Sequence, residues 1–590
     1  MPRPAHVREL GLWCDPERVF QQLGPHEPWL VWLDSGVNAT RGKSIIAVGH
    51  PGSTVVTAYA ASGILSTRQL DGDATAVECV DRISAEWANK GDDQARSPNA
   101  DAGDPECADK GSAERADEAS AECADKGSAE RADETSTECA ERVDAERVEG
   151  SCDGRGAAAS LFDRLAAALS AELAGLHTVC VDPPGSPPSA VGSAGLLGWY
   201  GWFGYELGAS INGVVPSASD APGASDAPGA SDAPDAPDAP DAVFLFVDRA
   251  LVFDHEARAV RLVWCGDDHS QWAAATERSI LAWAAEETLP SGAAAPGGEF
   301  PSLEFNETAP SRAPRWHHTP TEYADLIVCC QTAIARGDAY QLCLTNRIDI
   351  DVHPDPVATY LALRHASPSH HGGFLRFGEH TLLSASPEQF VRVSCEGLVE
   401  TRPMKGTRPR GGDEASDRAL RAELLASDKE RAENLMIVDL MRNDLSRIAR
   451  LGTVTVPSLL VVEQYAQVHQ LVSTVQARLR SGLTALDVVR AAFPAGSMTG
   501  APKQRAMELL REFEDGPRGV YSGVFGYLGL DGSADLAMVI RSIVLTPTGA
   551  SIGTGGGVTA LSHVAEEIAE TQLKARVLLQ VLGASLPTVR

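Results

Sequence analysis

Two pairs of glutamates are the residues whose type and spacing most directly suggest chemistry. Glu430 and Glu433 lie three apart in a helical stretch, and the same stripe continues to Ile437. Because that stripe is otherwise apolar it points inward, where a carboxylate needs a partner. Glu567 and Glu570 repeat the spacing in a second helical stretch. Two inward pairs suit Mg²⁺, which prefers carboxylate, water and substrate oxygens; the alternative is solvated helix faces, or salt bridges to nearby arginines.

Two glycine-rich segments offer backbone to a ligand. FPAGSMTGAPK at 493–503 leads into a helix starting at Pro502, and the free N–H groups of a first helical turn attract anions. GTGGGV at 553–558 follows a strand and lets a ligand approach the main chain closely. Neither segment matches a P-loop or a dinucleotide fingerprint. The alternative is two ordinary loops.

Lys405 and Glu388 are candidates for covalent and acid catalysis. Lys405 lies at the end of a predicted strand, just before Gly406, and desolvation that lowered its pKa would make it a nucleophile. Glu388, in a Ser-Pro-Glu turn, is a candidate general acid. Taken singly, such a lysine is more often a surface residue and such a glutamate a turn residue.

The elements that must position these residues differ between the two halves of the chain. The N-terminal half is rich in strand patterns, with candidates near 28–36, 43–49 and 242–265. The stretch 196–208 is dense in glycine and aromatic residues, which suggests close backbone packing. In the C-terminal half a helix is predicted over 319–336, a long helical stretch over 413–450, and a last helix over 563–582. Most strands are joined by turns. This pattern favours mixed, largely antiparallel sheets with helices packed outside.

Two low-complexity segments interrupt this pattern, at about 90–155 and 217–242. The first repeats a 16-residue unit, which is why Cys107, Cys123 and Cys139 recur without metal-ligand spacing. We predict a β-rich N-terminal region over 1–310 that contains both insertions, and a catalytic domain over 315–585.

The charge of the chain is dominated by the same segments. Within them, residues 101–153 and 217–242 carry a net charge of −18, more than half of the total of −31. Such acidity argues against a nucleic-acid partner. Because no long apolar run or secretory leader is apparent, we expect no membrane partner and a cytoplasmic protein with reduced thiols.

Taken together and in order, the motifs resemble the chorismate-binding family, densely over 317–585. They are YQLCLTNR, SASPEQF, TRPMKGTRPRG, ERAENLMIVDLMRNDLSRIA, FPAGSMTGAPKQRAME, YSGVFGYLG, AMVIRS and GTGGGVTALSHVAEEIAETQLKA. The resemblance implies the α+β fold of the synthase component I proteins of this family. In that fold, large and mostly antiparallel sheets pack as a sandwich with helices outside.

The resemblance also implies roles for individual residues. Glu433 and Glu570 would bind Mg²⁺, with Glu430 and Glu567 beside them, and Glu388 would be the acid that helps the C4 hydroxyl of chorismate leave. The residues that would contact or line the substrate are Gln341, Thr407, Lys503, Tyr521, Arg541, Gly555, Gly556, Gly557 and Lys574.

Three positions separate the activities within the family. Gln341 stands where isochorismate-forming members have a lysine that activates water, so it fits the amine-using branch. Lys405 stands where anthranilate synthases have a small residue, and Gln470 replaces their histidine. The resemblance therefore implies the aminodeoxychorismate synthase branch, in which the lysine attacks C2 of chorismate and ammonia then adds at C4. We expect no catalytic role for His469.

The expected reaction needs chorismate, ammonia and Mg²⁺. We find no glutaminase signature, so a separate glutamine amidotransferase subunit, or free ammonium, is expected to supply ammonia. The product would serve 4-aminobenzoate and folate synthesis, or an aminobenzoate-derived metabolite. The alternatives are anthranilate synthase component I and a non-catalytic chorismate-binding regulatory subunit.

Overall fold

The structure is a computed structural model, and it describes residues 5–70, 160–176, 194–214, 239–266, 269–287, 313–465, 468–584 and 586. These residues belong to one compact unit, made of Met1–Arg82 and Ser160–Arg590. The predicted insertion at 90–155 and positions 217–238 of the second insertion lie outside the described residues. So do Cys107, Cys123 and Cys139.

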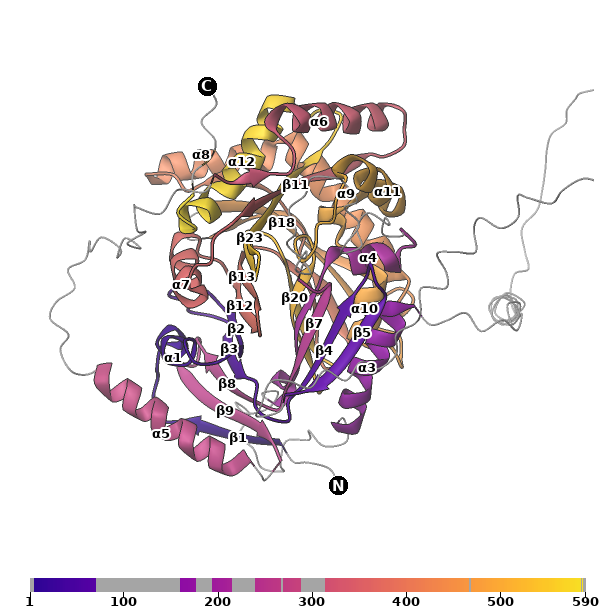
Figure 1. The fold of residues 1–590 in the computed structure, drawn as a ribbon. Helices are drawn as coiled ribbons and strands as arrows, with labels where there is room; N and C mark the ends of the chain where they lie inside the picture. Colours follow the sequence, from indigo (N-terminus) through magenta and orange to yellow (C-terminus); the bar gives the residue numbers. More distant parts are fainter. Residues whose placement is uncertain are drawn as a thin grey trace, which may run out of the picture. The chain divides into compact units, whose positions relative to one another are not determined.

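Two large antiparallel sheets form the framework of this unit (Figure 1). The first has twelve strands, in the order β1 (Ala5–Leu10), β9 (Ala259–Cys265), β8 (Arg249–Asp254), β3 (Lys43–Val48), β2 (Trp29–Asp34), β12 (His371–Phe377), β13 (His380–Ser386), β22 (Ser542–Thr546), β23 (Gly549–Val558), β11 (Gln341–Ile350) and β10 (Arg315–Trp316), with β19 (Gly500–Ala501) also paired to β11.

The second sheet has eleven strands. Their order is β16 (Met404–Pro409), β18 (Val468–Arg478), β15 (Leu398–Thr401), β14 (Gln389–Val393), β21 (Ala534–Met538), β20 (Val524–Gly529), β6 (Gly198–Phe203), β7 (Ala242–Val247), β4 (Thr54–Tyr59) and β5 (Ile64–Gln69), with β17 (Thr455–Gln464) also paired to β18.

Strands from both halves of the chain share each sheet. In the first sheet β2 pairs with β12, and in the second β6 pairs with β20. Residues 288–312, which include the predicted end of the first region, lie outside the described part. The predicted division near 310 therefore separates stretches of sequence whose strands are hydrogen-bonded to each other.

Helices cover the outer faces of the sheets. They are α1 (Pro16–Leu23), α3 (Leu161–Leu176), α4 (Tyr205–Ile211), α5 (Ser270–Glu287), α6 (Pro320–Ala335), α7 (Pro356–Ala366), α8 (Glu414–Ala426), α9 (Asp428–Ser446), α10 (Ala485–Ala492), α11 (Lys503–Glu514) and α12 (Val564–Val581). Helices α12, α7 and α5 contact strands of the first sheet, and α9 and α3 contact strands of the second. This arrangement confirms the predicted α+β class.

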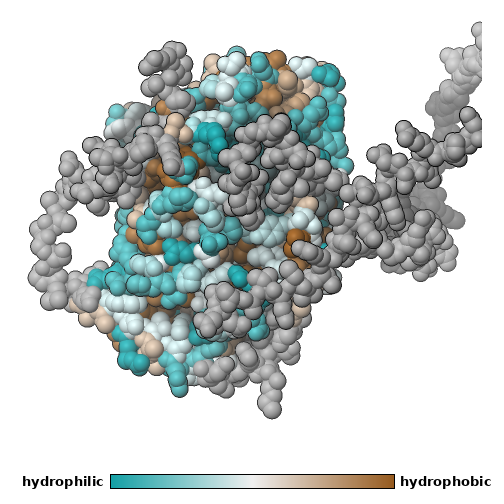
Figure 2. Space-filling view, in the orientation of Figure 1, coloured by the Kyte–Doolittle hydropathy of each residue, from teal (hydrophilic) through white to brown (hydrophobic). Residues whose placement is uncertain are grey.

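The apolar core has a layer between the sheets and a layer under each set of helices. Strand β7 is apolar at successive positions and does not alternate between apolar and polar residues. Val243 and Leu245 belong to the cluster between the sheets, whereas Phe244 belongs to the cluster under α3. Both faces of the strand are thus buried, which removes the hydrophobic–polar period. The face in Figure 2 is mostly hydrophilic, with hydrophobic residues in separate patches.

Three local expectations need correction. The helical stretch predicted over 413–450 is two helices, because Ser427 has an extended backbone (φ −67°, ψ 110°) and caps both α8 and α9. Pro502 is the N-cap of α11 and not its first residue, since its ψ is 142°. The glycine run at 553–557 lies inside strand β23 instead of following a strand. By contrast, the predicted helix over 319–336 is confirmed as α6, with the Thr319–Glu322 capping box.

Candidate functional site

Helices α9 and α12 bring the four predicted glutamates to one place beside β23 and β18 (Figure 1). The Ser427 side chain accepts a hydrogen bond from the Glu430 N–H and so fixes the start of α9. Glu430 lies in the first turn of α9, and Glu567 in the first turn of α12. The positive end of each helix dipole favours a carboxylate there.

Two of the four carboxylates are buried, and each lies beside a lysine. Glu433 is 7% exposed and Glu567 3% exposed. Lys405 Nζ lies 3.8 Å from Glu433 Oε2, and Lys429 Nζ lies 3.2 Å from Glu567 Oε1. Burial raises the pKa of Glu433. The charges of Lys405 and Lys429 lower this pKa, whereas the neighbouring Glu430 and Glu567 raise it further. Glu433 is therefore a carboxylate that a nearby cation would stabilise.

The glycine run of β23 forms the adjoining wall. A Cβ added at Gly556 would lie 3.1 Å from Glu567 Oε2, and one at Gly557 would lie 2.5 Å from Gln341 Nε2. Lys574 Nζ donates to the Gly555 carbonyl oxygen at 2.7 Å and pairs with Glu570 at 2.8 Å. Side chains at these positions would strike the site residues, so glycine is needed for this close approach.

A bulge in β16 positions Lys405. Lys405 lies opposite Leu471 of β18, and the register shifts between Lys405 and Thr407. Gly406 makes this shift with φ +79°, a conformation that favours glycine. A Cβ on Gly406 would lie 2.9 Å from the Glu430 carboxyl carbon, so the bulge packs directly against the glutamates.

The environment of Lys405 keeps it protonated. Burial lowers its pKa, but Glu433 and then Cys343, Glu388 and Glu570 raise it, and the net pKa lies above that of an ordinary lysine. The expected lowering by desolvation is thus outweighed by the surrounding acidic groups. A nucleophilic role for Lys405 requires a step that removes its proton.

Glu388 and Gln341 add further polar groups around this lysine. Burial raises the Glu388 pKa to about 7, against the opposing effects of Lys405 and of a hydrogen bond with Ser497. A carboxyl with that pKa exchanges protons readily near neutral pH. Gln341 is 1% exposed, and neither polar atom of its side chain has a hydrogen-bond partner among the described residues. A buried amide of this kind is available to a ligand.

Tyr521 and Arg541 lie further along the interior face of β23. A Cβ on Gly553 would lie 1.9 Å from the Tyr521 ring, which therefore packs flat against the strand. Arg541 has φ +52°, and its guanidinium makes no hydrogen bond or ion pair within the described part of the chain. Burial lowers its pKa, whereas Tyr521 and Glu570 raise it. An unpaired guanidinium beside these groups is a receptor for a carboxylate.

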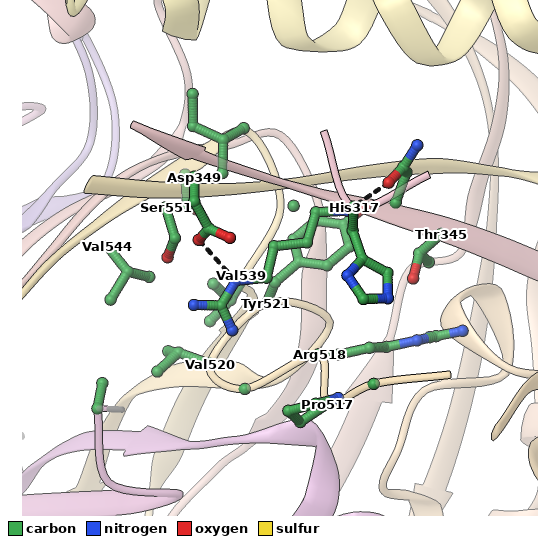
Figure 3. Close-up of a pocket in the computed structure, with 18 of the residues that line it drawn as sticks. His317, Thr345, Asp349, Pro517, Arg518, Val520, Tyr521, Val539, Val544 and Ser551 are labelled. Carbon is green, nitrogen blue, oxygen red and sulfur yellow. Dashed lines mark hydrogen bonds and ion pairs between the residues drawn. The ribbon is translucent and has the colours of Figure 1, made fainter. Parts of the chain in front are cut away.

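Tyr521 also borders a cavity between the sheets (Figure 3). Arg518 lies on its wall, held by Glu514 with contacts of 2.7 Å, and Glu514 accepts from the Thr345 N–H at 2.8 Å. This buried ion pair ties α11 to β11, the strand that carries Gln341. The cavity residues other than Tyr521 and Gly553 were not singled out from the sequence.

Two predicted site residues lie elsewhere. Lys503 Nζ donates to Asp444 Oδ2 at 2.6 Å and to the Ala492 carbonyl at 2.7 Å, so it joins α11 to α9 and α10 and contacts none of the four glutamates. Thr407 is exposed and lies opposite Gln470 in β18. The His469 ring contacts Asp417 of α8 at 2.9 Å.

Sequence reasoning missed Lys429 and Ser497. Lys429 is adjacent to Glu430 in sequence, but its partner Glu567 is 138 residues away. Ser497 lies inside the glycine-rich loop at 493–503, where no pattern shows that its hydroxyl reaches Glu388. The position of Ser497 within that loop was the only available signal.

The glutamates fit a magnesium ion by donor type. They offer only carboxylate oxygens, in a partly buried setting where Glu430 and Glu567 raise the pKa of Glu433. Within the described residues, no three of the four have carboxylate oxygens all within 4.8 Å of one another. A cation there would take some of its ligands from water or substrate, as Mg²⁺ commonly does.

Curated proteins of known activity are similar to this chain over part of its length. The chain is 45% identical over 340 residues to an aminodeoxychorismate synthase of Streptomyces pristinaespiralis, covering 58% of this chain and 47% of the relative. It is 42% identical over 298 residues to anthranilate synthase component 1 of Mycobacterium bovis, covering 50% of this chain and 58% of the relative. It thus spans about half the length of these curated relatives.

A solved structure and a family model complete the comparison. The crystal structure of anthranilate synthase component I from Streptococcus pneumoniae superposes with a TM-score of 0.52 at 32% identity, covering 65% of this chain and 80% of that one. Residues 129–580 match the family described as chorismate binding enzyme. This chain belongs to the chorismate binding enzyme family.

Proposed function

We propose that the chain converts chorismate and ammonia into 4-amino-4-deoxychorismate. The observation that carries the proposal is the placement of Lys405, whose Nζ lies 3.8 Å from Glu433 and 3.6 Å from the position of a Cβ on Gly557. It shares this place with the unpaired amide of Gln341. The Streptomyces relative named aminodeoxychorismate synthase supports the same assignment.

The site offers separate groups for the two carboxylates of chorismate. Arg541 is the unpaired cation, and Lys574 lies at the glycine run. Glu430, Glu433, Glu567 and Glu570 would hold Mg²⁺, which would supply electrostatic stabilisation to a substrate carboxylate and to the departing oxygen. The Gly556 and Gly557 backbone would allow the ring to lie against β23.

Lys405 would form the covalent bond to the substrate, and Glu388 would transfer the protons. Glu388 takes a proton from the Lys405 ammonium, and the free amine attacks C2 of chorismate. The ring double bond shifts, the C4 hydroxyl takes the proton from Glu388, and water leaves. Glu388 then removes a proton from the new C2–nitrogen bond. Ammonia adds at C4 and the double bond returns as Lys405 departs with the proton held by Glu388. The new C4 ammonium then gives up the second proton, which restores the Lys405 ammonium and leaves the product amine.

Ammonia would come from a separate glutamine amidotransferase subunit or from free ammonium. The product would feed 4-aminobenzoate and folate synthesis, or an aminobenzoate-derived metabolite. None of the helices in the described residues is long and apolar enough to cross a membrane. The cytoplasmic location expected from the sequence stays a prediction.

Anthranilate synthesis is the second candidate, because the Mycobacterium relative is 42% identical. The two differ at Lys405. The pure chain and its Lys405→Ala variant should be incubated with chorismate, Mg²⁺ and ammonium, and the products identified by mass spectrometry. We expect aminodeoxychorismate from the parent chain and none from the variant. Formation of aminodeoxychorismate by the variant at the full rate would refute the covalent role, and anthranilate from the parent chain would favour the second candidate.

A further inference from the structure

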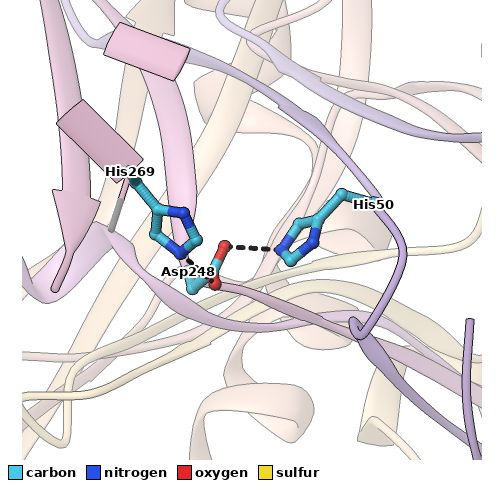
Figure 4. Close-up of side chains that lie close together, drawn as sticks. All are labelled: His50, Asp248 and His269. Carbon is cyan, nitrogen blue, oxygen red and sulfur yellow. Dashed lines mark hydrogen bonds and ion pairs between the residues drawn. The ribbon is translucent and has the colours of Figure 1, made fainter. Parts of the chain in front are cut away.

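A cluster of two histidines and one aspartate lies where the chain passes between the two sheets (Figure 4). His50 follows β3 of the first sheet and precedes β4 of the second. Asp248 is the one residue between β7 of the second sheet and β8 of the first, and His269 immediately precedes α5. Three separate connections therefore meet at this point, away from the glutamates.

The donor atoms of the cluster converge. Asp248 Oδ1 lies 2.9 Å from His50 Nε2, and Asp248 Oδ2 lies 2.9 Å from His269 Nε2. One donor atom from each of the three side chains falls within 4.8 Å of the others. The side chains are 23%, 14% and 11% exposed for His50, Asp248 and His269, so the cluster is accessible to small ions but shielded from bulk water.

Both ring nitrogens of His50 lie close to oxygen atoms that can only accept hydrogen bonds. Nδ1 lies 2.7 Å from the Pro51 carbonyl oxygen, which can only accept. A neutral imidazole carries one N–H, so donating from Nδ1 leaves a lone pair on Nε2. In that neutral form the Nε2 lone pair faces a carboxylate oxygen, a second acceptor, and a cation between the two atoms would bind both. An Nδ1–H to backbone carbonyl bond is also the contact that orients metal-binding histidines.

A single cation can bind both Nε2 atoms and a carboxylate oxygen at once, whereas each proton joins only one nitrogen to one oxygen. Ligands about 2.0–2.1 Å from a tetrahedral Zn²⁺ lie roughly 3.3 Å from each other. The His269 Nε2–Asp248 Oδ2 pair is at 2.9 Å, and the three donor atoms lie within 4.8 Å of one another, so binding needs shifts of about 1.5 Å at most. Arg249 Nε lies 3.3 Å from Asp248 Oδ1, which leaves Oδ2 as the better ligand and gives Oδ1 an outer hydrogen bond.

We propose that His50, Asp248 and His269 bind a divalent cation of the Zn²⁺ class through the two Nε2 atoms and one carboxylate oxygen, with water completing the coordination. Two imidazoles and one carboxylate match Zn²⁺ chemistry. The all-oxygen preference of Mg²⁺ keeps this site distinct from the glutamates. The ion fastens the β3–β4 and β7–β8 connections to α5, so its first effect is on stability.

The test uses the full chain, stripped with EDTA, exchanged into buffer with excess Mg²⁺ and a phosphine reductant, and titrated with Zn²⁺ or Co²⁺. We expect one tight site that gives the visible absorption of tetrahedral Co²⁺ without a thiolate charge-transfer band, which excludes the cysteines. Zn²⁺ at about 100 times its Kd should raise the unfolding temperature by roughly 2–3 °C.

Variants separate ligation from folding. Asp248→Asn keeps the shape of the side chain, and the double variant His50→Gln/His269→Gln keeps polar groups, so circular dichroism should show both folded. Each should bind Zn²⁺ at least about 100-fold more weakly. The matched control is His353→Gln, whose side chain is 60% exposed and lies 3.9 Å from Asp351; it should bind as the parent chain does. Equal Zn²⁺ binding by the parent chain and Asp248→Asn, or no uptake by the parent chain, would overturn the proposal and leave a hydrogen-bonded cluster only.

Discussion

Replacing Glu388 by glutamine should make the protein more stable above neutral pH and far less active. The carboxyl has a pKa of about 7 in the folded protein, against an ordinary value of 4.5. The difference corresponds to about 3 kcal/mol. Between these two pH values the folded protein holds this proton more tightly than the unfolded chain, so the group costs stability as the pH rises. Glutamine cannot ionise and removes that cost.

The stability part is measured by urea unfolding of the parent chain and Glu388→Gln at several pH values. The free energy of unfolding of the variant, relative to that of the parent, should increase by about 3 kcal/mol between pH 4.5 and about pH 8. Most of this increase should occur between pH 4.5 and 7. The exposed Glu396→Gln is the control and should show no comparable trend. A difference between variant and parent that stays flat with pH would refute the assignment of a raised pKa to Glu388.

The activity part follows from the proton relay. Loss of a positioned acid typically costs about 10²–10⁴-fold in rate. Because the competent pair holds one proton shared by Glu388 and Lys405, kcat/KM for chorismate should rise as the pH approaches 7, with free ammonia held constant. The variant should lose both the rate and this dependence. Retention of the same rising limb in Glu388→Gln would show that another group controls it.

Three further predictions concern the frame of the site. Gly406→Ala should lower the free energy of unfolding by about 1–3 kcal/mol, because φ +79° strains alanine and the new Cβ would lie 2.8–2.9 Å from its neighbours. The control is Gly412→Ala, whose Cβ would have nothing within 4 Å and which should change little in denaturant unfolding. Arg518→Met should cost about 3–5 kcal/mol in the same assay, because it leaves the buried Glu514 carboxylate unpaired; a loss below 1 kcal/mol (about the value of a surface pair) would contradict the network. Glu567→Gln should raise the Mg²⁺ concentration for half-maximal activity by about 100-fold; an unchanged Mg²⁺ titration would remove this residue from the metal site.

Most of the correct predictions came from short-range patterns, such as the helical spacing of apolar residues. The inward stripe of Glu430, Glu433 and Ile437 showed a helix face, and Glu433 and Ile437 are indeed buried there. The Thr319–Glu322 capping box marked the start of α6. Such signals lie within a few residues of each other, so the sequence displays them directly.

Long-range pairing was not predictable in the same way. The family resemblance implied that Lys503 lies at the substrate, yet it pairs with Asp444, 59 residues earlier. Lys429 was passed over although it reaches Glu567 across 138 residues. Burial and charge balance are properties of the assembled site, so a lysine in isolation does not show which carboxylate will stabilise it.

The pKa of Lys405 illustrates the same limit. Desolvation alone predicts a lowered pKa and a ready nucleophile, and burial does act in that direction. Glu433 and the other acidic groups reverse the outcome, so a route for the proton becomes part of the mechanism. Glu388, with its pKa of about 7, is the group that can provide it.

The most direct test of the central claim is the position of nitrogen in the product. The full chain should be supplied with chorismate, Mg²⁺ and ¹⁵N-ammonium, and the product followed by NMR and mass spectrometry. The account predicts ¹⁵N bonded to the saturated C4 of the ring, with the enolpyruvyl group retained and no pyruvate released. Nitrogen on C2 of an aromatic ring, with release of pyruvate, would contradict it.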